Sequence, residues 1–117
     1  MNIERDPLGT AAHQPGAKLD AGKTKAWLCL SGFSHALSEV ANVTTQGAKK
    51  YTPNGWRSVP GGKERYMDAL ARHLLALGRG EHLDQDTGCL HLAQVAWNAL
   101  AVLELDISET TKNDRTA

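Results

Sequence analysis

The segment from residue 88 to residue 105 constrains this chain most, because it is apolar on nearly every side yet carries a polar stripe. Its polar residues are spaced i, i+3 and i+7, which places them on one face of a helix: His91, Gln94 and Asn98. A stripe that faces solvent is normally richer in Lys and Glu, and a stripe in the core is Leu or Ile. These side chains therefore need partners on another helix or on a ligand, because an unpaired buried polar group costs about 1–3 kcal/mol.

Two earlier segments repeat this combination of apolar and polar faces. The periodicity predicts a first helix over residues 24–49, unless it breaks near Ser31 and Gly32, and a second over residues 63–77 that ends at a glycine stop. The sequence thus predicts an all-α fold, a small bundle of three helices, or of four if the first one is broken. The polar positions are His35, Glu39, Asn42 and Gln46 on the first helix and Arg65, Asp68 and Arg72 on the second.

Pro, Gly and polar residues set the expected boundaries of the domain. Residues 1–20 hold two Pro and two Gly and few apolar residues, which predicts a flexible N-terminal arm. Residues 21–106 form the helical domain, interrupted by a loop over residues 51–62 that is rich in Pro and Gly. Residues 107–117 are polar and are expected to form a flexible C-terminal tail.

Composition excludes several classes of function. Thirteen basic residues balance thirteen acidic ones, so the basic excess typical of proteins that bind duplex nucleic acid is missing. No apolar run approaches the roughly 20 residues that span a bilayer, and the N-terminus lacks the apolar stretch of a signal peptide. We therefore expect a cytoplasmic protein without membrane contact. Cys29 and Cys89 lack CxxC spacing and are expected to be reduced thiols.

The third helix also predicts self-association. A helix that is apolar around most of its circumference must be buried on more than one side, which a three-helix monomer provides poorly. We expect a homo-oligomer, most simply a symmetric dimer, in which helices of both protomers complete the core. A ligand would then lie between helices, partly at the subunit interface.

Cationic and aromatic residues around the loop over residues 51–62 suggest a site for a phosphorylated ligand. Lys50, Arg65 and Arg72 would pair with phosphate oxygens, and Tyr51 or Trp56 offers a flat face for a base. The structural alternative is a helix end with favourable cations and a Trp packed over the core. The complete set assigned to ligand binding is Lys50, Tyr51, Asn54, Trp56, Arg65, Arg72, His73, His91 and Asn98.

Carboxylates on inward stripes are the candidate metal ligands. Glu39 and Asp68 are the two that qualify, and two or three carboxylates with phosphates suffice for Mg²⁺. Alternatives are an Asp68–Arg72 helix pair and, for the loop carboxylates, a capping or turn role. His73 and His91 could equally be core histidines bonded to a backbone group or a carboxylate. Without a nucleophile constellation, a Walker loop or a zinc motif, the catalytic residues are unknown. The loop carboxylates are Glu81, Asp84 and Asp86.

The blocks GAKKYTPNGW and RYMDALARHLLALGRGEHLDQDTGCLHLAQVAWNALAVLEL together carry a resemblance to a known family. They contain R-x-x-D-A-x-x-R-H, a G-x-x-x-D loop and H-L-A-x-x-A-x-N in that order. Over residues 19–105 the chain resembles the N-terminal helical domain of phage dATP/dGTP diphosphohydrolases, a domain that also occurs alone in phage genomes. The resemblance implies that residues 21–106 form a nucleotide-binding type of domain.

The resemblance leaves several functions open. The wider all-α NTP pyrophosphatase class holds Mg²⁺ on an E-E-x-x-E helix and a second E-x-x-D helix. Here Glu39 has no neighbouring Glu, and His91 and Gln94 stand where E-x-x-D would be. These departures from the magnesium motifs favour a protein that binds a purine nucleotide or related phosphorylated ligand. Such a protein would hold the ligand without hydrolysis and could sequester it. The alternatives are Mg²⁺-dependent hydrolysis of dATP or dGTP with release of pyrophosphate, and a structural or regulatory interaction module. The sequence does not identify the base of the ligand, the number of its phosphates, or whether it is linear or cyclic.

Overall fold

The computed structural model describes residues 4–116, with side chains through residue 111. Within these residues there are four α-helices and no strand, which confirms the predicted all-α fold. The chain divides into two compact units, the first ending at Phe33 and the second beginning at Ser34. The helices are α1 (Ala26–Gly32), α2 (Ser34–Lys50), α3 (Gly62–Gly78) and α4 (His91–Thr116), and a 3₁₀ turn, η1, covers Gly55–Ser58.

The first unit begins with turns that are organised around one buried carboxylate. Asp6 Oδ1 accepts a hydrogen bond from the backbone N–H of Leu8 at 2.7 Å, and Oδ2 accepts one from Lys18 at 2.8 Å. The N–H of Ala21 also donates to the carbonyl of Arg5 at 3.0 Å. The segment before α1 therefore has defined contacts without regular secondary structure, and its flexibility stays a prediction.

These bonds make the order of this segment depend on pH. The backbone N–H groups of Lys18 and Leu8 lower the pKa of Asp6 and outweigh the opposing effect of burial. A carboxylate with a lowered pKa stabilises the folded form above the ordinary Asp pKa and loses that contribution as pH falls through its lowered value.

We expect the amide resonances of Leu8 and Lys18 to move together in an NMR titration from about pH 6 to about pH 2, with a midpoint below the ordinary Asp value of about 3.9. Asp6→Asn should abolish this titration, because an amide side chain does not ionise. A midpoint at or above the ordinary value would show that the two N–H groups do not hold the carboxylate in solution.

The long first helix predicted from the sequence is broken close to Ser31 and Gly32, where the sequence analysis considered a break. α1 ends at Gly32 and α2 begins at Ser34, because Phe33 between them has φ −117° and ψ 29° and leaves the helical conformation. The N–H of Phe33 donates instead to the carbonyl of Leu30 at 3.3 Å. Residues 4–116 therefore contain four helices rather than three.

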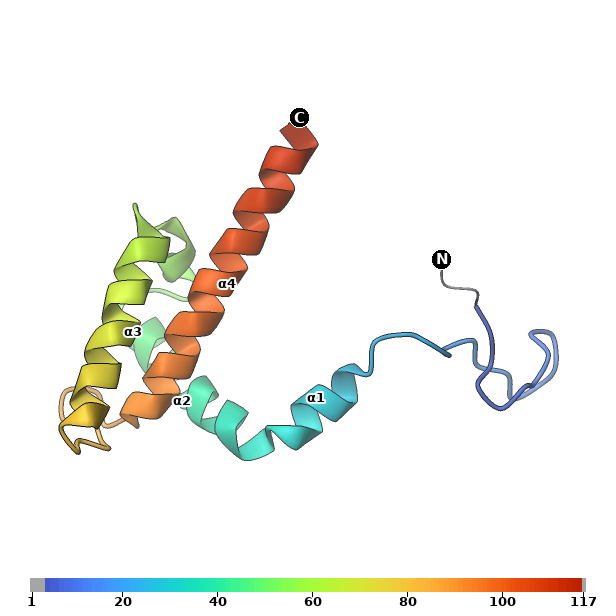
Figure 1. Cartoon of the computed structure of the whole chain (residues 1–117), viewed down its shortest axis with the longest axis horizontal. Helices are drawn as coiled ribbons and strands as arrows, with labels where there is room; N and C mark the ends of the chain where they lie inside the picture. Colours follow the sequence, from blue (N-terminus) through green and yellow to red (C-terminus); the bar gives the residue numbers. More distant parts are fainter. Residues whose placement is uncertain (1–3, 117) are drawn as a thin grey trace. The chain divides into compact units, whose positions relative to one another are not determined.

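In the second unit, α3 and α4 run side by side as an antiparallel hairpin (Figure 1). The buried apolar residues between and beside them are small, namely Ala76, Ala93, Ala101 and Cys89. Gly62 is also buried, and a Cβ at this position would lie 3.2 Å from Leu105 Cδ1. Small side chains thus let the two helices approach closely.

An aromatic cluster joins η1 to the hairpin. Trp56, Tyr66 and Trp97 meet edge to face, with ring centroids 5.6–6.2 Å apart. Such pairs stabilise a structure by about 0.5–1.5 kcal/mol beyond their buried area. The Tyr66 hydroxyl also donates to the carbonyl of Trp56 at 2.8 Å. The loop predicted over residues 51–62 therefore contains a helical turn that is fixed onto the α3–α4 hairpin.

α2 packs against α4 and contacts the loop that precedes α4 through Asn42. Its Nδ2 lies 3.6 Å from Sγ of the buried Cys89. Cys29 is exposed, and neither cysteine forms a disulfide in the structure; that both are reduced thiols stays a prediction. α4 extends to Thr116, past the end predicted at Leu105, so the segment assigned to the C-terminal tail begins as helix; its flexibility stays a prediction.

The large apolar side chains of the hairpin lie mainly on its outer faces. Leu100 and Leu103 of α4, for example, are each about half exposed. Helical spacing places Leu92, Leu100, Leu103 and Ile107 on one face of α4, away from Ala101. No described helix is long and apolar enough to cross a membrane. The exposed apolar residues of α3 are Met67, Leu74 and Leu75.

Candidate functional site

The loop over residues 79–90 closes one end of the α3–α4 hairpin with its own network of backbone hydrogen bonds. The N–H of Asp84 donates to the carbonyl of Cys89 at 2.8 Å, and the N–H of Gly88 donates to the carbonyl of Asp84 at 2.8 Å. The first N–H of α4, that of His91, donates to the carbonyl of His82 at 2.9 Å. Gly88 has φ +73°, a left-handed conformation that suits glycine. The loop is therefore folded back onto the helices that it joins.

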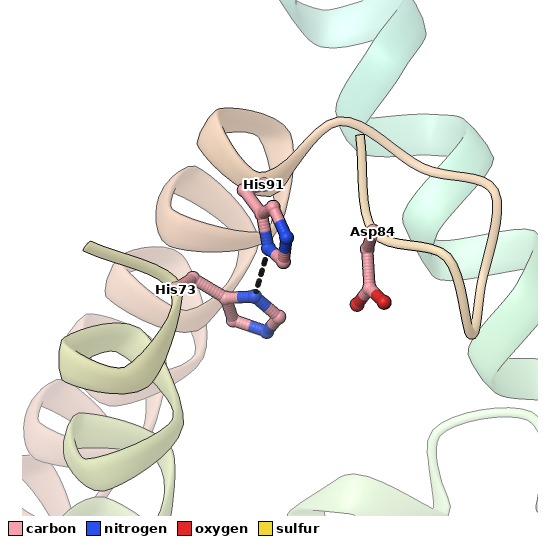
Figure 2. Close-up of side chains that lie close together, drawn as sticks. All are labelled: His73, Asp84 and His91. Carbon is pink, nitrogen blue, oxygen red and sulfur yellow. Dashed lines mark hydrogen bonds between the residues drawn. The ribbon is translucent and has the colours of Figure 1, made fainter. Parts of the chain in front are cut away.

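Two histidines face each other across the hairpin just below this loop. Nδ1 of His73 on α3 lies 2.8 Å from Nδ1 of His91 at the start of α4, and the ring centroids are 5.1 Å apart (Figure 2). A neutral imidazole has one N–H and one bare nitrogen, so one ring donates and the other accepts. His91 is 8% exposed and His73 is half-buried. The pair is consequently shielded from much of the solvent.

Asp84 brings a carboxylate to the same place. Figure 2 shows the three side chains converging from α3, from the loop and from the start of α4. One potential ligand atom from each of His73, Asp84 and His91 lies within 4.8 Å of the others. Asp84 is held by two donors, the N–H of Asp86 at 2.9 Å to Oδ1 and Gln94 Nε2 at 3.0 Å to Oδ2. The carboxylate is thus oriented before any ligand binds.

The surroundings shift two pKa values in this group. Desolvation, with a smaller contribution from the charge of His91, lowers the pKa of His73 and so favours its neutral form. Burial alone would raise the pKa of Asp84, but the hydrogen bonds from Asp86 and Gln94 and the nearby imidazoles outweigh it and lower this pKa. The site therefore combines an ionised carboxylate with a neutral imidazole at pH 7.

A pocket of about 560 Å³ opens beside these groups and is lined by Arg72, Arg79 and His82 as well as His73, Asp84 and His91. Arg79 pairs with Glu81 at 3.1 Å, and both side chains are exposed. Guanidinium groups beside a pocket are suited to a phosphate or carboxylate ligand. The pocket thus offers cationic donors on its rim and imidazole and carboxylate groups on its wall.

Three of the residues assigned to ligand binding from sequence, Arg72, His73 and His91, meet in this pocket. Asn98 is buried, and its Nδ2 donates to the carbonyl of Gln94 at 2.8 Å within α4. Arg65 is exposed, and its guanidinium donates to the carbonyl of Pro60 at 3.2 Å.

The remaining ligand candidates lie around η1 and the end of α2. Lys50 Nζ lies 5.4 Å from the centroid of the Tyr51 ring, a cation–π distance, and Tyr51 is 72% exposed. Asn54 has φ +59° and supplies the left-handed residue before η1. Trp56 belongs to the aromatic cluster, which supports the alternative of a packed Trp. These four residues do not line the pocket, and their ligand-binding role stays a prediction.

Glu39 and Asp68, the candidate magnesium ligands, are both exposed, on α2 and α3 respectively. Neither belongs to the group of three close metal-ligating side chains that the described part of the chain contains, His73, Asp84 and His91. That group does not fit Mg²⁺, which strongly prefers oxygen ligands. The magnesium site at Glu39 and Asp68 stays a prediction.

From the sequence, Asp84 is a cap or turn residue, or in the enzyme alternative one of two loop carboxylates, with Glu81, that would join Glu39 and Asp68 at Mg²⁺; it was not paired with the two histidines. Asp84 does form a turn with Asp86, but Gln94 also links it to α4. The sequence feature that could have indicated the pairing of the histidines was the hairpin formed by the second and third predicted helices. In two antiparallel helices a step back along one helix is matched by a similar step forward along the other, as between the facing pairs His73–His91 and Tyr66–Trp97. Arg79 and His82 on the pocket were also missed.

The polar stripe of α4 finds its partners within the chain. His91 bonds His73, Gln94 Nε2 reaches Asp84 and also Thr87 Oγ1 at 3.3 Å, and Asn98 bonds the turn before it. Among the described residues, every buried side-chain N or O atom has a hydrogen-bond partner. His91 and Gln94 of this stripe are therefore structural elements of the loop closure, and His91 also lines the pocket.

These features define a small all-α domain whose helical hairpin carries a polar pocket at its closed end. Residues 13–115 match the family described as dATP/dGTP diphosphohydrolase, N-terminal, and the chain belongs to this family. Over 100 residues it is 33% identical to a dATP/dGTP diphosphohydrolase of Salmonella phage PMBT28. That alignment covers 86% of this chain and 33% of the relative, so the chain spans about a third of the relative's length. No solved structure matches the chain.

The Gln94–Asp84 contact gives a direct test of this loop closure. Gln94→Leu leaves the half-buried carboxylate without its side-chain donor, which should lower the free energy of unfolding by about 1–3 kcal/mol in urea denaturation. Gln85→Leu is the matched control, because Gln85 is exposed in the same loop, and it should change stability by no more than about 0.5 kcal/mol. Equal stability of the two variants would remove Gln94 as the link between loop and helix.

Proposed function

We propose that this chain binds a purine nucleotide, or a related phosphorylated ligand, in the pocket at the closed end of the α3–α4 hairpin. The observation that carries this proposal is the position of Arg72 and Arg79 on a pocket whose wall holds His73, Asp84 and His91. The arginines suit phosphate oxygens, and the imidazoles offer hydrogen bonds to the remainder of the ligand. Membership of the dATP/dGTP diphosphohydrolase family supports a purine deoxynucleotide as the first ligand to examine.

Binding without turnover is the preferred form of this proposal. The group of close metal-ligating side chains on the pocket has two imidazoles and one carboxylate, which does not suit Mg²⁺, and Glu81 pairs with Arg79. Release of the ligand intact would fit a protein that senses or sequesters a nucleotide. The second candidate is Mg²⁺-dependent diphosphohydrolysis, which is favoured by the likeness to the phage dATP/dGTP diphosphohydrolase. That relative is much longer, so its activity need not lie in the segment that this chain matches.

Arg72 tests the nucleotide pocket. Replacing it with Ala removes a charge-assisted hydrogen bond, which should cost about 1.5–3 kcal/mol, or about 10- to 150-fold in affinity for dATP or dGTP in calorimetric titration. Arg72→Lys should also weaken binding, because an ammonium group cannot form the bidentate fork. Arg65→Ala is the matched control, since Arg65 lies on the same helix but bonds the carbonyl of Pro60. Wild-type affinity for Arg72→Ala in a folded protein would exclude this pocket.

The two forms of the proposal are separated by the fate of the nucleotide. The protein is incubated with dATP, dGTP or GTP and Mg²⁺ or Mn²⁺, and the products are separated by chromatography. Recovery of the intact nucleotide from the protein supports binding alone. Release of pyrophosphate that Glu39→Ala abolishes would establish the enzyme and place its metal at the carboxylate predicted from sequence.

We also propose that the chain is a homo-oligomer in which a second copy covers the outer face of α4. The stripe of Leu92, Leu100, Leu103 and Ile107 is roughly half exposed, although such residues supply most of the burial energy in folded proteins. Among the side chains that the structure describes, the buried apolar ones belong to Ala and Cys. A symmetric dimer would bury the same stripe on both protomers.

Sedimentation equilibrium should therefore give a multiple of the 12.6 kDa chain mass. A Leu100→Glu and Leu103→Glu double variant should shift the protein toward monomer, because association would bury two carboxylates without partners. Glu104→Lys changes the charge of a neighbouring exposed position and should leave the mass unchanged. A wild-type mass of 12.6 kDa at all concentrations would contradict the oligomer.

A further inference from the structure

We propose that His73, Asp84 and His91 bind a divalent transition-metal ion of the Zn²⁺ type. The three side chains come from three parts of the chain, the end of α3, the closing loop and the start of α4 (Figure 2). One ligand atom from each lies within 4.8 Å of the others, so small adjustments bring all three to one ion. The inference is independent of nucleotide binding, because the metal alone would occupy these donors.

The donor set selects the class of metal. Two imidazole nitrogens and one carboxylate oxygen suit Zn²⁺, Co²⁺, Ni²⁺ or Fe²⁺, whereas Mg²⁺ and Ca²⁺ require oxygen ligands. Three protein ligands leave a fourth coordination position open, as in sites where zinc binds water or substrate. Because the same residues line the pocket beside Arg72 and Arg79, that open position is accessible to an anionic ligand.

The surroundings orient the donors in the way that metal sites require. Gln94 Nε2 and the N–H of Asp86 hold the two carboxylate oxygens of Asp84, and Gln94 is itself fixed against Thr87 Oγ1 at 3.3 Å. Such outer contacts set the direction of a ligating carboxylate and stabilise the bound ion. Gln94 is 7% exposed, so water competes little for its amide.

The histidine pair fits an ion after a small movement. The two Nδ1 atoms are 2.8 Å apart and share a hydrogen bond. Tetrahedral bonds of about 2.0–2.1 Å from Zn²⁺ place two nitrogens about 3.3–3.4 Å apart, so the rings need to separate only slightly. The ion then takes the place of the proton between the rings, and the ring that donated this proton changes to the Nε2–H tautomer, so that both neutral imidazoles bind through Nδ1. His73 is the ring with more freedom, because it is half-buried whereas His91 is 8% exposed.

The test is titration of chelator-treated full-length protein with Zn²⁺, and with Co²⁺, by calorimetry and visible absorption. The proposal predicts one ion per chain, a Co²⁺ spectrum of low coordination number, and no displacement by excess Mg²⁺. His73→Gln, His91→Gln and Asp84→Asn should each weaken binding more than about 100-fold, and Gln94→Leu by about 10- to 100-fold. His82→Gln is the matched control, since His82 lines the pocket but lies outside the group, and it should bind like the wild type.

Circular dichroism and thermal unfolding separate loss of the site from loss of the fold. Saturating Zn²⁺ should raise the melting temperature of the wild type and of His82→Gln, because a ligand that binds only the folded state stabilises it. The same addition of Zn²⁺ should leave the melting temperature of folded His73→Gln unchanged. This variant tests the site even where His91→Gln fails to fold. Absence of stoichiometric binding by the wild type, or binding by His73→Gln at wild-type affinity, would overturn the proposal and leave the pair as a hydrogen bond between two neutral imidazoles.

Discussion

The close approach of α3 and α4 along small residues is the constraint on which the second unit depends. Ala76, Ala93 and Ala101 are buried there, and Gly62 lies against Leu105 with no space for a Cβ to be added freely. Helices that pack through small side chains bury little apolar surface per residue. The stability of the hairpin must therefore come also from the aromatic cluster at one end, from the polar closure at the other, and from whatever covers the outer leucines.

This arrangement explains why polar residues occur in an apolar helix. At the closed end, His91 and Gln94 reach partners on α3 and on the loop, and Asp84 gives the loop a contact that backbone hydrogen bonds alone would not supply. Groups that satisfy one another in the free protein are held near the positions that a ligand needs, which lowers the entropic cost of binding. The side chains that hold the loop against the helices are thus also those of the candidate binding site. The arginines beside them are not needed to hold the loop.

Local patterns predicted the helices well, because periodicity and glycine stops act within a few residues. Such local patterns were enough to predict the break before Ser34 and the end of α3. They also predicted the polar face of His91, Gln94 and Asn98. The partners of that face were not, because the pairing of His73 with His91 depends on the register of two helices. The long-range link from Gln94 to Asp84 depends further on the conformation of the loop. The magnesium carboxylates were sought on helical stripes, whereas the structure gathers nitrogen ligands at the loop.

The most direct test of this account is backbone hydrogen exchange in the free protein, without metal or nucleotide. The N–H groups of Asp84, Gly88 and His91 each donate to a carbonyl in the closing loop, so they should exchange much more slowly than unstructured amides. Gln85, an exposed residue of the same loop, provides an internal comparison. Protection of the three amides in the wild type, reduced in Gln94→Leu, is the predicted result. Exchange of all three at the rate of an unstructured peptide would contradict a loop that is folded before ligand binds.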